Sequence, residues 1–253
     1  MKDKIDLNSN AVILRKEYKE DSFSPIDVFS FINNIDDITL VYYPISKRIS
    51  GMCIKINKAD KLIAINSTTS YGRQRFTVAH ELYHLFFQEK FVNTICPSKI
   101  EGVKDIEERN ANQFASFFLA PHEALQSYIS TISDDGEKPL REYEIIQIEQ
   151  HFGMSRQATL FRLVSEKYIT LQFANTLKTN VIQSARKFGF DDSLYIMQPP
   201  EKQYRTTGKY IELVELLNQR GIISHGKYEE YLLEAFRTDI VYNLETEWDE
   251  VYD

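Results

Sequence analysis

The feature that most constrains the fold is a pair of histidines four positions apart within an apolar stretch. Residues 80–84 read His-Glu-Leu-Tyr-His, inside the segment RQRFTVAHELYHLFFQEK (73–90). Residues four apart in a helix lie one turn above each other on one face. The imidazoles of His80 and His84 can therefore converge on one tetrahedral metal ion. A helix that is apolar over most of its surface is usually buried. The segment predicts a central helix that carries a metal site.

The residue after the first histidine predicts the chemistry of this site. Glu81 points to the side of a metal held by His80 and His84, where it can take a proton from a metal-bound water without binding the metal. The simpler alternative is a buried helix with two core histidines. That alternative requires a separate polar partner for each ring, because burying an unpaired imidazole costs free energy. We therefore predict a zinc-dependent hydrolase with Glu81 as its catalytic base.

A catalytic zinc needs a third protein ligand as well as an open position. The three histidines outside the motif do not complete a third-histidine pattern. A second predicted helix, DIEERNANQFASFFL (105–119), offers Glu108 instead. Alanines on the same stripe would let the two helices approach closely, and Asn112 lies one turn after Glu108, placed to hold a ligating histidine. We predict His80, His84 and Glu108 as metal ligands, with Asn112 behind one of the rings.

Some assignments at the site stay open in the sequence. Asp105 fits the N-cap of the second helix, with Glu108 completing a capping box rather than binding metal. Glu107 becomes the ligand if that helix is rotated. Three other side chains have the chemistry to stabilise an oxyanion, although packing or surface positions explain them equally well: Tyr83, His122 and His151.

Three sequence blocks occur in order along the chain. They are RQRFTVAHELYHL (73–85), ERNANQFA (108–115) followed by Leu-Ala-Pro, and FGMS (152–155) followed by Arg162-Leu163. Over about residues 24–170 the chain resembles the ImmA/IrrE family of metallo-endopeptidases. It departs from the common pattern at Tyr83, where members usually have glycine. Since this position need not touch the metal, we expect a change in packing alone.

The resemblance carries expectations about activity. It implies a zinc endopeptidase with a gluzincin-like site of His80, His84 and Glu108, and with Glu81 as the base that assists attack by zinc-bound water. It also implies a protein substrate, often a transcriptional repressor or another regulator.

Two other classes of protein remain as alternatives. Residues 141–169 have the pattern of a helix-turn-helix, with two predicted helices joined by a tight turn at 153–155. Arg156 and Gln157 at the start of the second helix could read base edges. The net charge of −7 argues against DNA binding, because Lys and Arg supply most of the affinity for a phosphate backbone. The second alternative is an antitoxin-like module that binds a partner protein and keeps zinc for structure. An intact Glu81 favours the enzyme.

Composition limits the location that we expect. No stretch approaches the ~20 apolar residues that span a bilayer, and the first ten residues lack the apolar region of a secretory signal. Cys53 and Cys96 are too few for a disulfide framework, so we expect free thiols in a reducing compartment. The sequence therefore predicts a cytoplasmic protein with no membrane partner.

Outside the motif helices the sequence predicts a sheet. Segments 38–45, 51–57 and 61–67 are rich in β-branched and aromatic residues, and the last two fit a hairpin. A helix is expected to begin with Ser24 as its N-cap. The polar residues 1–22 predict no element.

The expected fold class is α+β: a zincin-like metallopeptidase domain with a small, mainly antiparallel sheet, then a mostly helical region. We place the domain over residues 1–172 and the helical region, of unknown role, over 173–253. Residues 198–202 are the linker candidate. Segments 208–221 and 224–244 predict helices within the C-terminal region.

Overall fold

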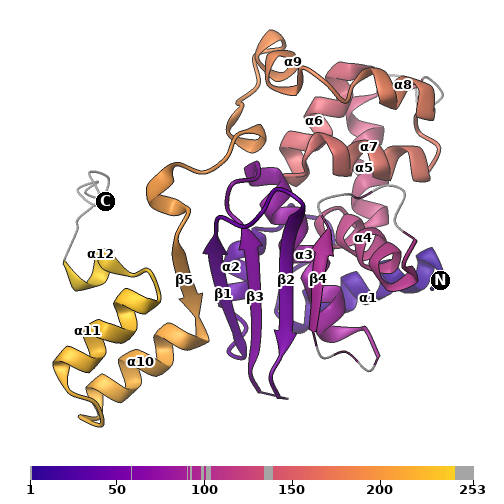
Figure 1. Cartoon of the computed structure of the whole chain (residues 1–253). Coiled ribbons are helices and arrows are strands. Elements are labelled where there is room, and N and C mark those ends of the chain that lie inside the picture. Colours follow the sequence, from indigo (N-terminus) through magenta and orange to yellow (C-terminus); the bar gives the residue numbers. More distant parts are fainter. Residues whose placement is uncertain are drawn as a thin grey trace.

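The structure is a computed structural model that describes residues 2–57, 59–89, 91, 93–97, 100, 104–133 and 139–242. Five strands form one sheet in the order β4-β2-β3-β1-β5 (Figure 1). Their bounds are β1 Ile38–Tyr43, β2 Ile49–Lys55, β3 Lys61–Asn66, β4 Asn93–Pro97 and β5 Arg205–Gly208. β1 and β3 are parallel, and the other neighbouring pairs are antiparallel. The predicted α+β class, the mainly antiparallel sheet and the β2–β3 hairpin are confirmed.

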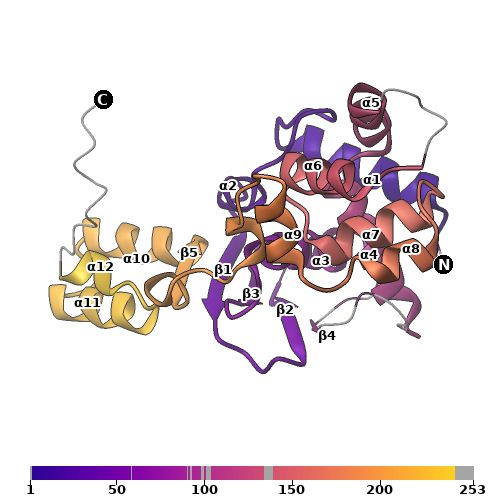
Figure 2. The same ribbon diagram turned by 90° about the horizontal axis from the view of Figure 1, so that it is seen from above.

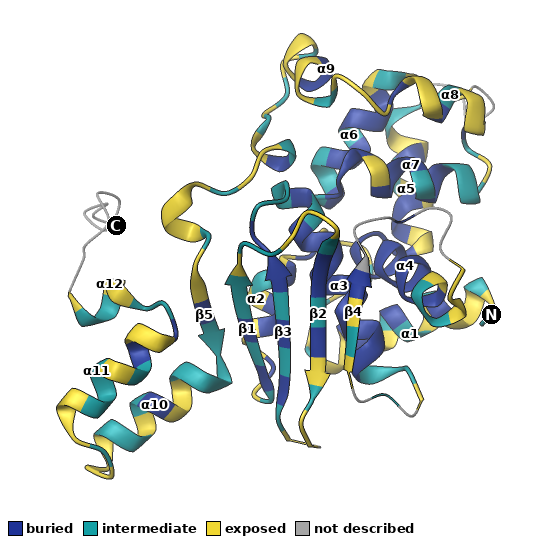
Figure 3. Ribbon diagram, in the orientation of Figure 1, coloured by how far each residue is buried: buried dark blue, intermediate teal, exposed yellow. Residues whose placement is uncertain are grey.

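One face of the sheet is buried beneath helices. Residues two apart on a strand point to the same face. Ile38 and Leu40 on β1, Ile63 and Ile65 on β3, and Cys53 on β2 are all inaccessible to solvent. In Figure 3 the buried residues gather on the strands and on the helices behind them. The core of the molecule therefore lies between the sheet and these helices.

The predicted motif helix is central. Helix α3 (Tyr71–Phe86) packs against β2 and β3, and every residue from Gln74 to Leu85 is buried. Helix α4 (Ile106–Leu119) packs along α3. Ala111 and Ala115 on α4 are fully buried. These small side chains allow the close helix approach that places the two motif blocks side by side.

The N-terminal segment differs from the expectation, because it forms helix α1 (Lys4–Glu17) on the outer side of α4. Leu7, Ala11 and Leu14 are buried at helical spacing. Ile5 and Ile13 are apolar too but are exposed on other faces of the helix, so the buried stripe does not stand out from the segment's composition. Arg15 is also fully buried, and its Nη1 donates a hydrogen bond to the Phe118 carbonyl near the end of α4.

The predicted helix start at Ser24 is wrong. Helix α2 (Val28–Asn33) begins after Asp27, whose side chain caps it. The carbonyls of Ser24 and Ile26 accept hydrogen bonds from Arg15 and Arg75 respectively. These long-range partners hold the preceding segment outside the helix.

A second layer of helices follows α4 and lies above the sheet in Figure 1. Its members are α5 (His122–Ile132), α6 (Glu142–Phe152), α7 (Arg156–Ser165), α8 (Leu171–Thr176) and α9 (Val181–Lys187). Two short 3₁₀ turns, η1 (Ser193–Tyr195) and η2 (Pro200–Lys202), lead back to the sheet. The second turn lies within the linker candidate 198–202.

The C-terminal region contributes a strand to the sheet before its helices begin. β5 pairs with β1 at the edge opposite β4. Gly208 ends β5 with φ +80°, and a Cβ there would lie 2.3 Å from the Ile38 carbonyl oxygen, so a glycine is required at this approach. The proposed boundary near residue 172 stays a prediction.

Three helices follow β5 and stand beside the sheet in Figure 2: α10 (Lys209–Gln219), α11 (His225–Glu234) and α12 (Thr238–Val241). The single helix expected over 224–244 is broken in two, and Phe236 at the break has φ +59°. Within the described part of the chain, no helix combines the length and the apolar character needed to cross a bilayer.

Candidate metal centre

The two helices bring three predicted ligands together. On α3, the Nε2 atoms of His80 and His84 lie 3.1 Å apart. From α4, Glu108 directs one carboxylate oxygen to each ring, at 3.3 Å from His80 Nε2 and 3.4 Å from His84 Nε2. Ligand atoms of these residues and of Cys96 all lie within 4.8 Å of one another. This group could hold a metal ion.

The distances fit one tetrahedral ion. Two ligands at about 2.0–2.1 Å from such an ion are about 3.3 Å apart. The three separations among His80, His84 and Glu108 span 3.1–3.4 Å. The two Glu108 distances are measured to different oxygens, Oε2 and Oε1, and each of the three separations taken alone is that of two ligands of one ion.

Hydrogen bonds behind the rings fix their orientation. The Asn112 amide nitrogen donates to the Ile100 carbonyl, which leaves Asn112 Oδ1 facing His80 Nδ1 at 2.9 Å. Gln88 Oε1 lies against His84 Nδ1 in the same way. Because an amide oxygen only accepts, each Nδ1 carries a proton and each Nε2 is free to bind a cation. Asn112 thus lies against the His80 ring, and its role behind a metal ligand stays a prediction.

The cluster favours positive charge between its members. Burial raises the pKa of the Glu108 carboxyl, but the hydrogen bonds and charges of His80 and His84 outweigh burial and hold that pKa well below its usual range. Burial lowers the pKa of the His84 imidazole, yet Glu108 and Glu81 raise it above its ordinary value overall. A cation placed at the Nε2 atoms is stabilised by both carboxylates.

Glu81 is completely buried, and neither of its carboxylate oxygens receives a hydrogen bond from a nitrogen or oxygen donor in the described part of the chain. A buried carboxylate without such a partner is costly. The backbone of β2 approaches it closely, since a Cβ on Gly51 would lie 3.1 Å from Glu81 Oε1 and 2.5 Å from Thr77 Cγ2. Glu81 therefore fits a site whose missing partner is a metal with its water.

The structure separates Glu108 from the alternative ligand Glu107. The Tyr83 hydroxyl donates a 2.7 Å hydrogen bond to Glu107 Oε2, away from the histidine pair. Asp105 caps α4 through the backbone N–H groups of Glu107 and Glu108. The cap is thus as predicted, but the Glu108 side chain turns to the histidines instead of completing a capping box. Tyr83 is fully buried and packs against Phe114, as expected for a packing residue.

The other candidate oxyanion donors have partners elsewhere. His122 is half exposed and lies 3.4 Å from the Glu166 carboxylate. His151 stacks on the Tyr128 ring with centroids 3.9 Å apart. Tyr83 donates its hydroxyl to Glu107. The Tyr83 ring does lie edge-on to the His84 ring, with centroids 5.7 Å apart, but none of the three directs a free polar group at the histidine pair.

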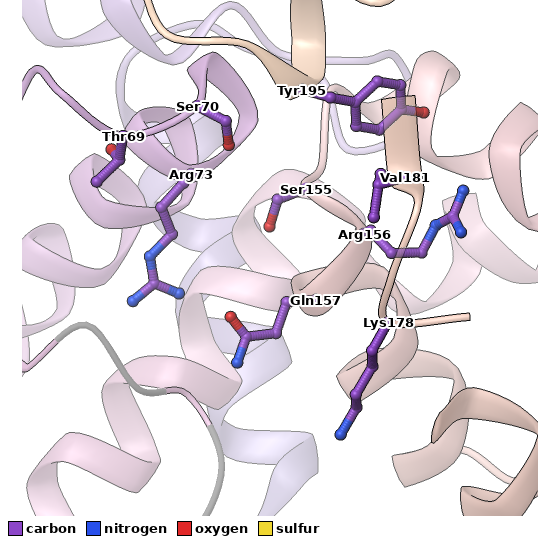
Figure 4. Close-up of a pocket in the computed structure, with 9 residues that line it drawn as sticks. All are labelled: Thr69, Ser70, Arg73, Ser155, Arg156, Gln157, Lys178, Val181 and Tyr195. Atoms are coloured by element: carbon purple, nitrogen blue, oxygen red, sulfur yellow. The ribbon is translucent and has the colours of Figure 1, made fainter. Parts of the chain in front are cut away.

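A cavity of about 520 Å³ opens between the starts of α3 and α7 (Figure 4). Arg73 lines it from α3, seven residues before His80, and is therefore on the same helix face about 10 Å along the axis. Gln157 and Lys178 line the cavity, whereas the guanidinium of Arg156 points away from Arg73 in Figure 4.

Arg156 cannot serve as a base-reading side chain in this arrangement. It is buried and forms an ion pair with Glu149, which is itself fully buried. Gln157 is exposed. The predicted succession of helix, tight turn and helix is present, because α6 and α7 are joined through Gly153 in the left-handed conformation. However, the first residue predicted to read bases, Arg156, is part of the core.

Comparison with known families agrees with this geometry. A sequence model described as the IrrE N-terminal-like domain, from a peptidase family, matches residues 36–164. The chain belongs to this family. The match runs from just before β1 to the end of α7 and contains both helices of the candidate metal centre. No curated protein matches the chain. The chain thus belongs to a metallopeptidase-type family and carries a group of side chains able to bind a metal.

Three residues of the candidate centre are not predicted from the sequence. Gln88 lies four residues after His84, a spacing that could have identified it. The sequence predicts Cys96 only as a free thiol, but strand β4 carries it to the cluster. Gly51 reaches Glu81 through strand pairing. No local pattern signals the last two positions.

Proposed function

We propose that the chain is a zinc-dependent endopeptidase with His80, His84 and Glu108 as metal ligands and Glu81 as general base. The observation that carries the proposal is the convergence of His80 Nε2, His84 Nε2 and the Glu108 carboxylate at separations of 3.1–3.4 Å. Beside them lies the buried Glu81 carboxylate, which has no nitrogen or oxygen donor among the described residues. Family membership supports a protease.

Each residue has a distinct part in the proposed reaction. A bound zinc would polarise the scissile carbonyl and lower the pKa of a bound water to about 7. Glu81 takes the proton from the attacking water and delivers it to the leaving amine. Asn112 and Gln88 hold the two imidazoles in the tautomer that binds metal.

The proposed substrate is a specific protein, such as a transcriptional repressor or another regulator. This part of the proposal follows from the family resemblance. Neither alternative class gains a supporting observation, because Arg156 is held by Glu149 and a structural zinc would not need the buried carboxylate of Glu81. Proteins encoded beside the gene are the first substrates to test.

The Glu81→Gln variant tests the assignment of the base. We expect it to bind zinc like the parent and to cleave about 10²–10⁴-fold more slowly, because it retains the side-chain shape but cannot take a proton. Cleavage is measured by mass spectrometry of fragments from candidate regulators, with zinc content measured on the same samples. Glu107→Gln, on α4 and paired with Tyr83, is the matched control and should keep its activity. A Glu81→Gln protein as fast as the parent would remove Glu81 from this role.

A further inference from the structure

The cluster contains one potential ligand more than a catalytic zinc requires. Cys96 lies on the edge strand β4, and its Sγ is 3.9 Å from Glu108 Oε1. In a tetrahedral zinc site, with a Zn–S distance of about 2.3 Å, a sulfur and an oxygen ligand are about 3.6 Å apart. The Cys96 sulfur and the Glu108 oxygen are thus within a few tenths of an ångström of the separation that two ligands of one ion require.

The thiol belongs to the same group of side chains as the predicted ligands. Ligand atoms of Cys96, His80, His84 and Glu108 all lie within 4.8 Å of one another, and Cys96 is buried. Glu81 is fully buried, with no nitrogen or oxygen donor to its carboxylate among the described residues. The proposed mechanism needs its water between Glu81 and the metal. An ion within reach of His80, His84 and Glu108 is therefore also within reach of the Cys96 sulfur, so the thiol and the water would compete for the remaining position.

We propose that Cys96 is a fourth metal ligand, whose thiolate closes the resting site and competes with the catalytic water for one coordination position. This inference rests on the metal centre proposed above. Four protein ligands make a closed site, whereas three ligands and a water make a catalytic one. The chain would therefore have a latent state and an active state at the same metal.

In the exchange between the two states, Glu81 accepts and returns the proton of the Cys96 thiol. On closing, a sulfur–metal bond forms, the water leaves, and the thiol proton passes to the Glu81 carboxylate. On opening, a water replaces the sulfur and the proton returns from Glu81 to Cys96. Cys96 and His84 are each 1% exposed, so neither side chain is directed to solvent.

The second cysteine provides a matched control. Cys53 lies on the neighbouring strand β2, is also buried, and contacts the backbone carbonyl oxygen of Glu81 through its sulfur. It does not belong to the group of potential ligands around the histidines. Cys96→Ser therefore changes a residue inside the cluster, and Cys53→Ser makes the same chemical change outside it, on an adjacent strand.

Cobalt(II) substitution tests the inference without an activity assay, because a thiolate ligand gives cobalt(II) an intense near-ultraviolet charge-transfer band. We expect the band in the parent and in Cys53→Ser, and its loss in Cys96→Ser with cobalt still bound. We also expect zinc affinity to fall at least about tenfold in Cys96→Ser, because the loss of even an outer partner of a metal ligand typically weakens binding by that factor. X-ray absorption of the unmodified, zinc-loaded chain should show one sulfur at about 2.3 Å, which avoids any dependence on a variant's folding.

The outcomes separate this inference from the metal centre itself. Cobalt binding with only nitrogen and oxygen ligands would overturn the role of Cys96 and leave the three-ligand site standing. A band that persists in Cys96→Ser, or that is lost in Cys53→Ser instead, would also overturn it. A parent chain that binds neither cobalt nor zinc would overturn the metal centre, and this inference with it.

Discussion

At the scale of single residues, the histidine pair depends on the amides behind it. Asn112 is itself oriented by the Ile100 carbonyl, so the chain of hydrogen bonds from backbone to amide to imidazole leaves His80 Nε2 directed at the cluster. At His84, Gln88 Oε1 lies against Nδ1. Such partners reduce the reorganisation that accompanies metal binding.

Removing one of these amides should weaken metal binding. We expect Asn112→Ala to lower zinc affinity about 10–100-fold, because the His80 ring loses the acceptor that fixes its tautomer. Competition with a chromophoric chelator measures the affinity. Asn110→Ala is the control, since Asn110 is also buried on α4 but accepts a hydrogen bond from the Lys2 backbone. Equal affinities for the two variants would show that Asn112 does not support the site.

The sequence predicts those site residues whose spacing has a local geometric meaning. His80, Glu81 and His84 follow from helix periodicity, and Asn112 follows from its position one turn after Glu108. The choice between Glu107 and Glu108 depends on the rotation of α4, which the Tyr83 hydroxyl and the packing of α4 on α3 determine. Cys96 depends on strand pairing across the sheet, which single-sequence patterns specify weakly.

At the scale of elements, the site depends on α4 being held against α3. Helix α1 covers the outer side of α4 and contributes Leu7, Ala11 and Leu14 to the core. The sequence does not predict α1, because its buried positions share the segment with the exposed apolar residues Ile5 and Ile13, which blurs the helical period. By contrast, β1, β2, β3 and α3 are predicted well, since they are continuous apolar or alternating stretches.

Shortening a buried side chain of α1 should destabilise the fold. We expect Leu14→Ala to lower the free energy of unfolding by about 2–5 kcal/mol, because Leu14 is 1% exposed and its removal leaves a cavity. Ile13→Ala, whose side chain is 58% exposed on the same helix, should change it by less than about 0.5 kcal/mol. Urea unfolding measures both. Equal losses would contradict the packing of α1 described here.

At the scale of the whole molecule, the burial of apolar side chains is uneven. The hydrophobic residues of α3 and α4 are almost all buried. Over α10, α11 and α12, the buried positions within helices are Val214 and Leu232. The C-terminal helices therefore add little core, although β5 anchors them to the sheet.

Amide hydrogen exchange should report this difference. We expect amides of α10 and α11 to exchange faster than those of α3 and α4, because regions with few buried apolar contacts open at lower free energy. Exchange followed by mass spectrometry of peptides gives both regions in one experiment. Equal protection of α10 and α3 would mean that the C-terminal helices share the stability of the core.

The most direct test of the central claim is a crystal structure of the zinc-loaded chain with anomalous diffraction at the zinc edge. We expect one anomalous peak per chain, about 2.0–2.1 Å from His80 Nε2 and His84 Nε2 and about 2.0–2.2 Å from a Glu108 oxygen. A peak at another group of side chains, or a site that Glu108 does not reach, would contradict it.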